Sequence, residues 1–330
     1  MKKKSACVLA GDIGGTKTNL GLFVAGKVRP KAHIIETFPS ASAVSLEVIV
    51  EQMLERYPVR IDTACFGIAG PVINGECRTT NLPWVVSERK LQKRFGWQQV
   101  RLINDLAATA MAVPLLNHRE VRAINGNRIR KNRNIGLVAP GTGLGLALLI
   151  YADGRYRPVA SEGGHASFAP SDENEIDLWH YLQARFGHVS MERVLSGRGL
   201  INIYDWLKSR RDFTESSEIK KAMATSDPAR IITANAIDGK DPLCRAALQR
   251  FCHIFGSIAG NLALTGMADG GIFLGGGIPP KILPLLEKGD FLTAFSAKGR
   301  FREFMQNIPV RVILNEKTAL LGAAHLVSGR

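Results

Sequence analysis

Two acidic side chains of this 330-residue chain stand where an apolar segment gives way to polar residues. Asp12 follows the apolar residues 6–10 inside a run of glycines, and Asp105 comes with Asn104 directly after residues 100–103. Ligands of open α/β sheets bind at the carboxyl ends of strands, where a carboxylate can accept a hydroxyl proton or bind a divalent cation. For Asp105 the simpler interpretation, the N-cap of a following helix, stays open.

Three glycine-rich turns, each directly after an apolar segment, predict a site for a nucleoside triphosphate. Glycine lets backbone amides approach phosphate oxygens closely. Any one turn could be a plain connection between strands, but three together favour the nucleotide. The residues expected to bind it are Gly11, Asp12, Ile13, Gly14, Gly15, Thr16, Gly141, Thr142, Gly143, Gly275 and Gly276.

A carboxylate at Asp12 would repel phosphates unless a divalent cation lies between them. We therefore expect Asp12 to hold Mg²⁺, directly or through water, although an aspartate that caps its own turn is the alternative. A P-loop is not expected, because Thr16 replaces its last glycine and a strand-like segment follows. The run 141–145 lacks the helix onset and distal acidic residue of a Rossmann oxidoreductase.

Further polar groups suit a sugar, whose hydroxyls need both donors and acceptors. Glu162, His165 and Glu192 supply carboxylates and an imidazole, and Asn81 is a weaker candidate. If the reaction is phosphoryl transfer, Asp105 is the expected base for the sugar hydroxyl. Taken singly, each of these residues could instead lie in a surface turn.

Apolar strands alternate with helical patterns, which predicts an α/β fold with two domains and a central cleft. The pattern of strand, glycine turn and strand that opens the chain restarts at 134–151, so the boundary is placed near residue 115. The predicted smaller domain is 1–115 and the larger is 116–314. The C-terminal residues 315–330 could cross back to the smaller domain, and the family resemblance described below assigns them there. Helical spacing occurs in residues 45–56, 106–113, 242–267 and 318–327.

Composition excludes several other classes of protein. Hydrophobic residues make up 45% and charged residues 22%, as in folded globular proteins. The five scattered cysteines predict reduced thiols in the cytoplasm, and no apolar run predicts a membrane helix or a signal peptide. The net charge of +14 and six basic residues in 119–133 could attract nucleic acid. A solvated loop on a protein that handles anionic ligands is favoured, because no nucleic-acid-binding motif accompanies the charge.

In the order and combination of its motifs the chain resembles the bacterial glucokinase family of the actin-like ATPase superfamily. The resemblance spans almost the whole chain. The motifs that carry it are Gly11-Asp12-Ile13-Gly14-Gly15-Thr16, Gly67-Ile68-Ala69-Gly70-Pro71, Leu102-Ile103-Asn104-Asp105, Gly141-Thr142-Gly143-Leu144-Gly145, Glu162-Gly163-Gly164-His165 and Glu192-Arg193-Val194-Leu195-Ser196-Gly197.

This resemblance implies a two-domain actin-like ATPase (ribonuclease H-like) fold, with ATP phosphates at the turns of Asp12 and Gly141 and adenosine near residues 275–277. It implies that a cytoplasmic homodimer phosphorylates the 6-hydroxyl of glucose, with Asp105 as base. The residues implied to hold glucose are Asn104, Asp105, Glu162, His165 and Glu192.

The resemblance also bears on zinc binding and leaves two alternative functions open. No cysteine follows His165 in residues 166–172, so the structural zinc of the related repressor/kinase branch is not expected. The alternatives are a kinase of another hexose or amino sugar, and a non-catalytic sugar-responsive regulator.

Overall fold

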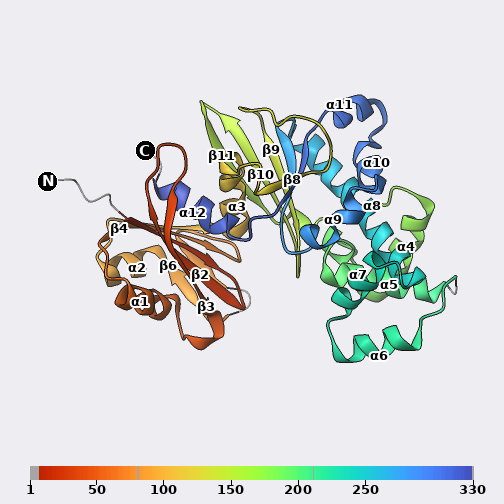
Figure 1. Ribbon diagram of the computed structural model, residues 1–330, viewed down its shortest axis with the longest axis horizontal. Coiled ribbons are helices and arrows are strands. Elements are labelled where there is room, and N and C mark those ends of the chain that lie inside the picture. The colour runs from red at the N-terminus through yellow and green to blue at the C-terminus, as the bar shows by residue number, and fades with distance from the viewer. Residues whose placement is uncertain (1–6, 80–81, 211, 329–330) are drawn as a thin grey trace. The chain divides into compact units, whose positions relative to one another are not determined.

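The computed structural model describes residues 7–79, 82–210 and 212–328 (Figure 1). Contacts divide the chain into two compact units. The first contains Met1–Asn117, Tyr156–Ala160 and Asn315–Arg330, and the second His118–Arg155 and Ser161–Leu314. The predicted domains differ from these units at residues 116–117 and 156–160, and the division into domains with a cleft stays a prediction.

The first unit is built on a five-stranded sheet in the order β3-β2-β1-β4-β7. The strands β1, β4 and β7 run parallel, while β2 and β3 extend the sheet as antiparallel strands. A separate hairpin pairs β5 with β6. The bounds are β1 (Cys7–Ile13), β2 (Lys17–Val24), β3 (Lys31–Pro39), β4 (Ile61–Ile68), β5 (Glu76–Arg78), β6 (Val85–Ser87) and β7 (Gln99–Asn104).

Helices cover both faces of this sheet (Figure 1). Along β1 the side chains alternate, so that Leu9 packs with α1 and α2 while Val8 and Ala10 pack with α12. The helix α12 also lies along α3. The helical segments are η1 (Ser40–Ser42), α1 (Leu46–Arg56), α2 (Glu88–Phe95), α3 (Asp105–Ala112), η2 (Val113–Leu115) and α12 (Thr318–Ser328).

A six-stranded sheet has the order β11-β10-β9-β12-β13-β8. Its strands belong to the second unit, except that residues 156–160 of the edge strand β11 are grouped with the first. Its centre is parallel, because β12 pairs in parallel with both β9 and β13. The strands β10 and β8 pair antiparallel with β9 and β13. The bounds are β8 (Val121–Ala123), β9 (Ile135–Pro140), β10 (Leu144–Ala152), β11 (Arg155–Ser161), β12 (Gly271–Leu274) and β13 (Val310–Ile313).

A 24-residue helix, α8, is the centre of the helical part of this unit. It begins after Asp241, whose carboxylate accepts the N–H of Cys244 at 2.7 Å, and it packs on α5, α7 and α10. The helical segments are η3 (Gly163–His165), α4 (Glu173–Phe186), η4 (Met191–Arg193), α5 (Gly197–Ser209), α6 (Ser217–Thr225), α7 (Pro228–Ile237), α8 (Pro242–Thr265), η5 (Pro279–Ile282), α9 (Leu283–Leu286), α10 (Asp290–Ser296), η6 (Gly299–Phe301) and α11 (Arg302–Gln306).

The helices predicted from spacing are confirmed as α1, α3, α8 and α12. The first glycine turn is shorter than predicted, because Gly11, Asp12 and Ile13 belong to β1 and only 14–16 form the turn. Gly11 serves close packing instead, since a Cβ there would lie 2.3 Å from Cδ1 of Phe66. Among the described residues, no helix has the length and apolar character that crossing a membrane requires.

Candidate active site

The first glycine turn joins β1 to β2 and is braced by η1. The N–H of Gly14 donates to the carbonyl of Lys17 at 3.0 Å, which closes the turn. Ser40 holds it from the side, because its hydroxyl donates to the carbonyl of Gly14 at 2.7 Å and its N–H to that of Thr16 at 3.0 Å. The turn is therefore a fixed and partly exposed backbone loop, as phosphate binding requires.

Asp12 lies one residue before the end of β1, in a hydrogen-bonded network. Nδ2 of Asn19 donates to Oδ2 of Asp12 at 3.2 Å. Oδ1 of Asn19 accepts from Oγ1 of Thr37 at 2.8 Å and from Nζ of Lys317 at 2.5 Å. Burial raises the pKa of Asp12, while the hydrogen bond from Asn19 and the charge of Lys317 act in the opposite direction. A cation at this carboxylate would offset the cost of burying its charge, so the site fits Mg²⁺.

Asn104 and Asp105 stand where β7 passes into α3. The N-cap of the helix is Asn104, whose Oδ1 accepts the N–H groups of Leu106 and Ala107 at 3.0 and 3.2 Å. Asp105 is the first helical residue, and its Oδ1 accepts the N–H of Leu106 at 2.8 Å. The capping interpretation of Asp105 is therefore wrong, because its neighbour fills that position.

Strand register brings Asp12 and Asp105 to one edge of the first sheet. Asp12 lies opposite Gly67 of β4, and Ile68 of β4 lies opposite Asn104 of β7. A Cβ at Gly67 would lie only 3.5 Å from Cα of Asp105. One acidic residue thus stands on each side of β4, at the carboxyl ends of three parallel strands.

In the second unit, the two other glycine turns are neighbours. They follow the parallel strands β9 and β12, and the N–H of Gly275 donates to the carbonyl of Val138 at 2.9 Å. Gly276 has a φ of +79°, and a Cβ there would lie 2.5 Å from the carbonyl oxygen of Pro140. The third turn can therefore approach the second only because position 276 is glycine.

Glu192 is attached to the second glycine turn. Its Oε2 accepts the N–H of Leu144 at 2.9 Å, and a Cβ at Gly143 would lie 2.5 Å from the same oxygen. The N–H of Gly197, the first residue of α5, donates to the carbonyl of Gly141 at 2.8 Å. The turn is thus held from both ends by the segment 192–197.

Glu162 stands at the N-cap position of the short helix η3, His165 is its last residue, and both are exposed. This helix is pressed against β10, because a Cβ at Gly164 would lie 2.1 Å from the carbonyl oxygen of Leu144. The N–H of Met191 donates to the carbonyl of Ala166 at 2.9 Å, which ties η3 to the segment of Glu192. The second unit therefore brings both glycine turns, residues 162–165 and Glu192 together.

One predicted site residue lies outside the described structure, and one residue near Asp12 was not predicted. Asn81 lies outside the described residues, and its place in the site stays a prediction. Lys317 was missed, although a lysine directly before the helical pattern 318–327 is a signal, because a cation is disfavoured at a helix N-terminus. Its partners Asn19 and Thr37 are about 300 residues away in sequence and cannot be read from spacing.

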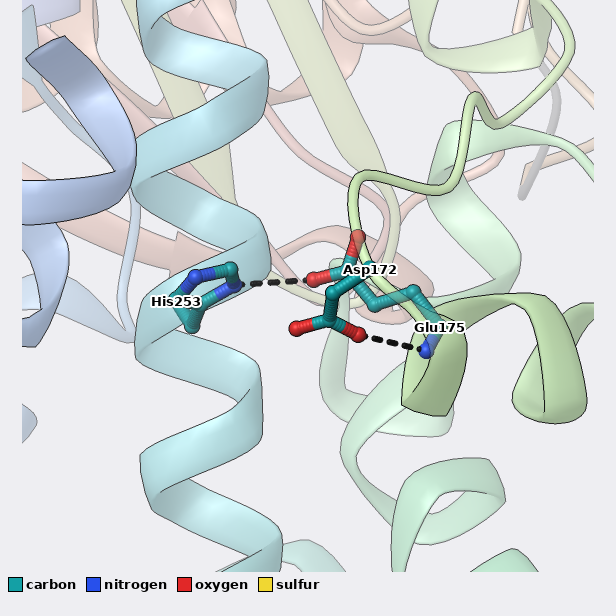
Figure 2. Close-up of side chains that lie close together, drawn as sticks. All are labelled: Asp172, Glu175 and His253. Atoms are coloured by element: carbon teal, nitrogen blue, oxygen red, sulfur yellow. Dashed lines mark hydrogen bonds and ion pairs between the residues drawn. The ribbon is translucent and has the colours of Figure 1, made fainter. Parts of the chain in front are cut away.

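A second cluster of ionisable groups joins α4 to α8 (Figure 2). Nδ1 of His253 lies 2.8 Å from Oε1 of Glu175, a fully buried carboxylate, and Asp172 caps α4 by accepting the N–H of Glu175 at 2.8 Å. Such a group could hold a metal ion. However, Nη1 of Arg250 donates to Oδ2 of Asp172 at 2.6 Å and to Oε1 of Glu175 at 3.4 Å. A guanidinium already supplies the positive charge, so we interpret the cluster as structural.

This cluster predicts a loss of stability in acid. Burial raises the pKa of Glu175, but hydrogen bonds from His253 and Ser171 outweigh it, so the pKa lies below the ordinary value. A lowered carboxyl pKa stabilises the fold above the pKa of the unfolded chain, and this stabilisation disappears as the pH falls through the folded-state pKa. Glu175→Gln should cost about 1–3 kcal/mol at neutral pH and flatten the dependence below about pH 5.

Urea unfolding of both proteins between neutral pH and about pH 4 measures this effect. The matched control is Glu173→Gln in the same first turn of α4, where the side chain is exposed. It should cost no more than about 1 kcal/mol. Equal stability of Glu175→Gln and the unaltered protein at neutral pH would contradict the structural role.

Comparisons with a family model and with known sequences both indicate the glucokinase family. Residues 9–329 match the family model described as Glucokinase. A glucokinase of Nostoc sp. (strain PCC 7120) is 40% identical over 333 residues, which span 96% of this chain and 97% of that protein.

Solved structures agree with the sequence relatives. A glucokinase from an Antarctic psychrotroph superposes with a TM-score of 0.89 at 33% identity, over 98% of this chain and 99% of that one. A ROK family glucokinase from Streptomyces griseus, in complex with glucose and AMPPNP, gives a TM-score of 0.64 at 20% identity, over 97% and 99%. The second likeness concerns the fold alone. The two-domain actin-like ATPase fold expected from the motifs is confirmed.

Proposed function

The chain belongs to the glucokinase family, and on that premise we propose that it transfers the γ-phosphoryl group of ATP to the 6-hydroxyl of glucose, giving glucose 6-phosphate. The observation that carries the proposal is the placement of Asp12 and Asp105 on either side of β4, at the carboxyl ends of the parallel strands of the first sheet. Phosphoryl transfer needs one group for the charged nucleotide and another for the attacking hydroxyl. The two carboxylates supply both.

Asp105 is the base in this proposal. The oxygen of the 6-hydroxyl attacks the γ-phosphorus, its proton passes to the carboxylate of Asp105, and the bond from phosphorus to the departing ADP oxygen breaks. The position suits the role, because Asp105 begins α3 and the N–H of Leu106 in the first turn donates to its Oδ1, and a helix N-terminus favours a negatively charged side chain. The capping oxygen of Asn104 fixes the start of the helix and with it the carboxylate.

The nucleotide residues follow from the three turns. We assign the phosphates of ATP to residues 11–16 and 141–143, and the adenosine to Gly275 and Gly276. Ile13 is buried, so it would contribute only its backbone. Asp12 would hold Mg²⁺, directly or through water, and this ion would neutralise phosphate charge. Support for ATP comes from the family and from the AMPPNP complex of the Streptomyces griseus protein.

The sugar residues are proposed from their side-chain chemistry and from the family resemblance. We assign glucose to Asn104, Asp105, Glu162, His165 and Glu192, with Asn81 as a further candidate. Carboxylates, an amide and an imidazole together offer the acceptors and donors that a hexose needs. The amide of Asn104 also serves the protein, since Nδ2 lies 3.4 Å from the carbonyl oxygen of Gly70. Because Oδ1 of Asn104 already accepts N–H groups at the start of α3, only its Nδ2 group would donate to a sugar hydroxyl.

We propose that the protein acts in the cytoplasm as a homodimer. Five scattered cysteines, none forming a disulfide among the residues described, suit a reducing compartment. The dimer rests on the family resemblance, and sedimentation at micromolar concentration measures it.

A coupled assay of ADP release tests the function directly. The protein is mixed with Mg²⁺ and ATP and supplied in turn with glucose, mannose, glucosamine, N-acetylglucosamine or no sugar. We expect glucose to give the highest kcat/KM and the sample without sugar to give none. Turnover of another sugar alone would change the proposed substrate, and no turnover with any of the sugars would overturn the proposed kinase activity.

A further inference from the structure

We propose that Lys317 is a positioning residue for the nucleotide, which orients the amide of Asn19 and, through it, the carboxylate of Asp12. The proposal rests on the function proposed above. It adds a residue that stands outside all the motifs by which the family is recognised in this sequence. The chain brings Lys317 to Asp12 from the far end of the sequence, directly before α12.

The contacts of Lys317 define its effect. Nζ lies 2.5 Å from Oδ1 of Asn19 and 3.3 Å from Oγ1 of Thr37. Nδ2 of the same Asn19 amide donates to Asp12 at 3.2 Å. The ammonium group thus reaches the Asp12 carboxylate through one intervening amide, and its charge also acts on that carboxylate.

The direction of these hydrogen bonds depends on the lysine. An asparagine amide can present either its oxygen or its NH₂ group, and the hydroxyl of Thr37 can donate to the first or accept from the second. An ammonium group only donates, so Lys317 requires the oxygen of Asn19 to face it. The NH₂ group must then face Asp12. Without the lysine, the amide of Asn19 is free to turn its oxygen toward Asp12 and repel it.

The position of Lys317 is unfavourable for the helix alone. Its carbonyl accepts the N–H of Leu321 at 3.0 Å, so it stands at the start of α12. The positive end of the helix dipole lies there and disfavours a cation. Residues that break such a local rule occur at functional sites, where another interaction compensates. Here the compensation comes from the network around Asp12.

The test separates nucleotide binding from folding. Calorimetric titration with Mg²⁺ and ADP, without sugar, is compared for the unaltered protein, Lys317→Met and Lys317→Arg. We expect Lys317→Met to bind about tenfold more weakly, since a hydrogen bond to a charged group is lost, and Lys317→Arg to recover most of this affinity. The unfolding midpoint of Lys317→Met should stay equal or rise, because this variant removes an unfavourable positive charge from the start of α12.

A matched control and a double variant exclude simpler explanations. Lys90 is an exposed lysine in the first turn of α2, so Lys90→Met removes a comparable charge and should leave the affinity unchanged. If Lys317 acts through Asn19, then Lys317→Met should weaken binding less than twofold in an Asn19→Leu background.

Kinetics give a second readout. The KM for ATP should rise about tenfold in Lys317→Met, while the KM for glucose changes less than twofold. Unchanged affinity for Mg²⁺ and ADP in a folded Lys317→Met protein would overturn the proposal, as would additive losses in the double variant. Failure of the unaltered protein to phosphorylate any sugar would instead overturn the function, whatever the titrations give.

Discussion

Replacing Asp105 by asparagine should lower kcat by roughly 100-fold or more, because the side chain that accepts the hydroxyl proton is lost. The fold should be retained. Oδ1 of an asparagine can still accept the N–H of Leu106, as Oδ1 of Asp105 does at 2.8 Å. The helix also keeps its N-cap, because Asn104 and not Asp105 fills that position.

Steady-state ADP release measures the effect, and circular dichroism with thermal unfolding confirms the fold. Asp290→Asn is the matched control, since Asp290 is also the first residue of a helix, α10, and is exposed. It should leave kcat within twofold. A folded Asp105→Asn protein with near-normal turnover would show that another group takes the proton.

The second large effect is expected at Gly322 in α12. A Cβ at this position would lie 1.8 Å from the carbonyl oxygen of Ala108 in α3, far inside any real contact. In an ordinary helix Gly→Ala stabilises by about 0.5–1 kcal/mol. Here we expect the opposite sign and a loss of about 1–3 kcal/mol or more, because backbone atoms of two packed helices must separate.

The same substitution should also slow turnover. Asp105 begins the helix that Ala108 belongs to, and a shift of a reacting group by about 1 Å can cost up to 100-fold in rate. Chemical unfolding and ADP release measure the two effects. The control is Gly126→Ala, where nothing lies within 4 Å of the added Cβ, and it should change neither. A Gly322→Ala protein as stable as the parent would show that α12 and α3 separate at little cost.

Local pattern was enough to predict most elements. The spacing of Leu46, Ile49, Val50, Met53 and Leu54 predicts one helical face. In α1 the first four side chains are buried and Leu54 is partly buried. The predicted turn after the first strand began too early, because Gly11 looks like a turn residue in sequence. In the structure it is a strand residue beneath Phe66, and that contact depends on β4, more than 40 residues later.

The site was predictable only in part, for a similar reason. Residue types placed Glu192 among the polar groups that could bind a ligand. They could not show that its carboxylate accepts the N–H of Leu144 beside a glycine turn, because that contact joins segments 48 residues apart. The same limit hid Lys317 and left the N-cap interpretation of Asp105 open, since choosing between two adjacent capping residues requires backbone geometry.

The membership of α12 in the first unit has a consequence for biosynthesis. Leu320, Ala323 and Ala324 cover one face of the first sheet, against Val8 and Phe23 from the start of the chain. A ribosome releases residues in order, so this apolar face stays open while the roughly 200 intervening residues of the second unit are made. Most of the unit that carries Asp105 is translated first, but its sheet is covered only after α12 has been synthesised at the end of the chain. Until then, this exposed apolar face is the part of the protein that a chaperone would have to protect.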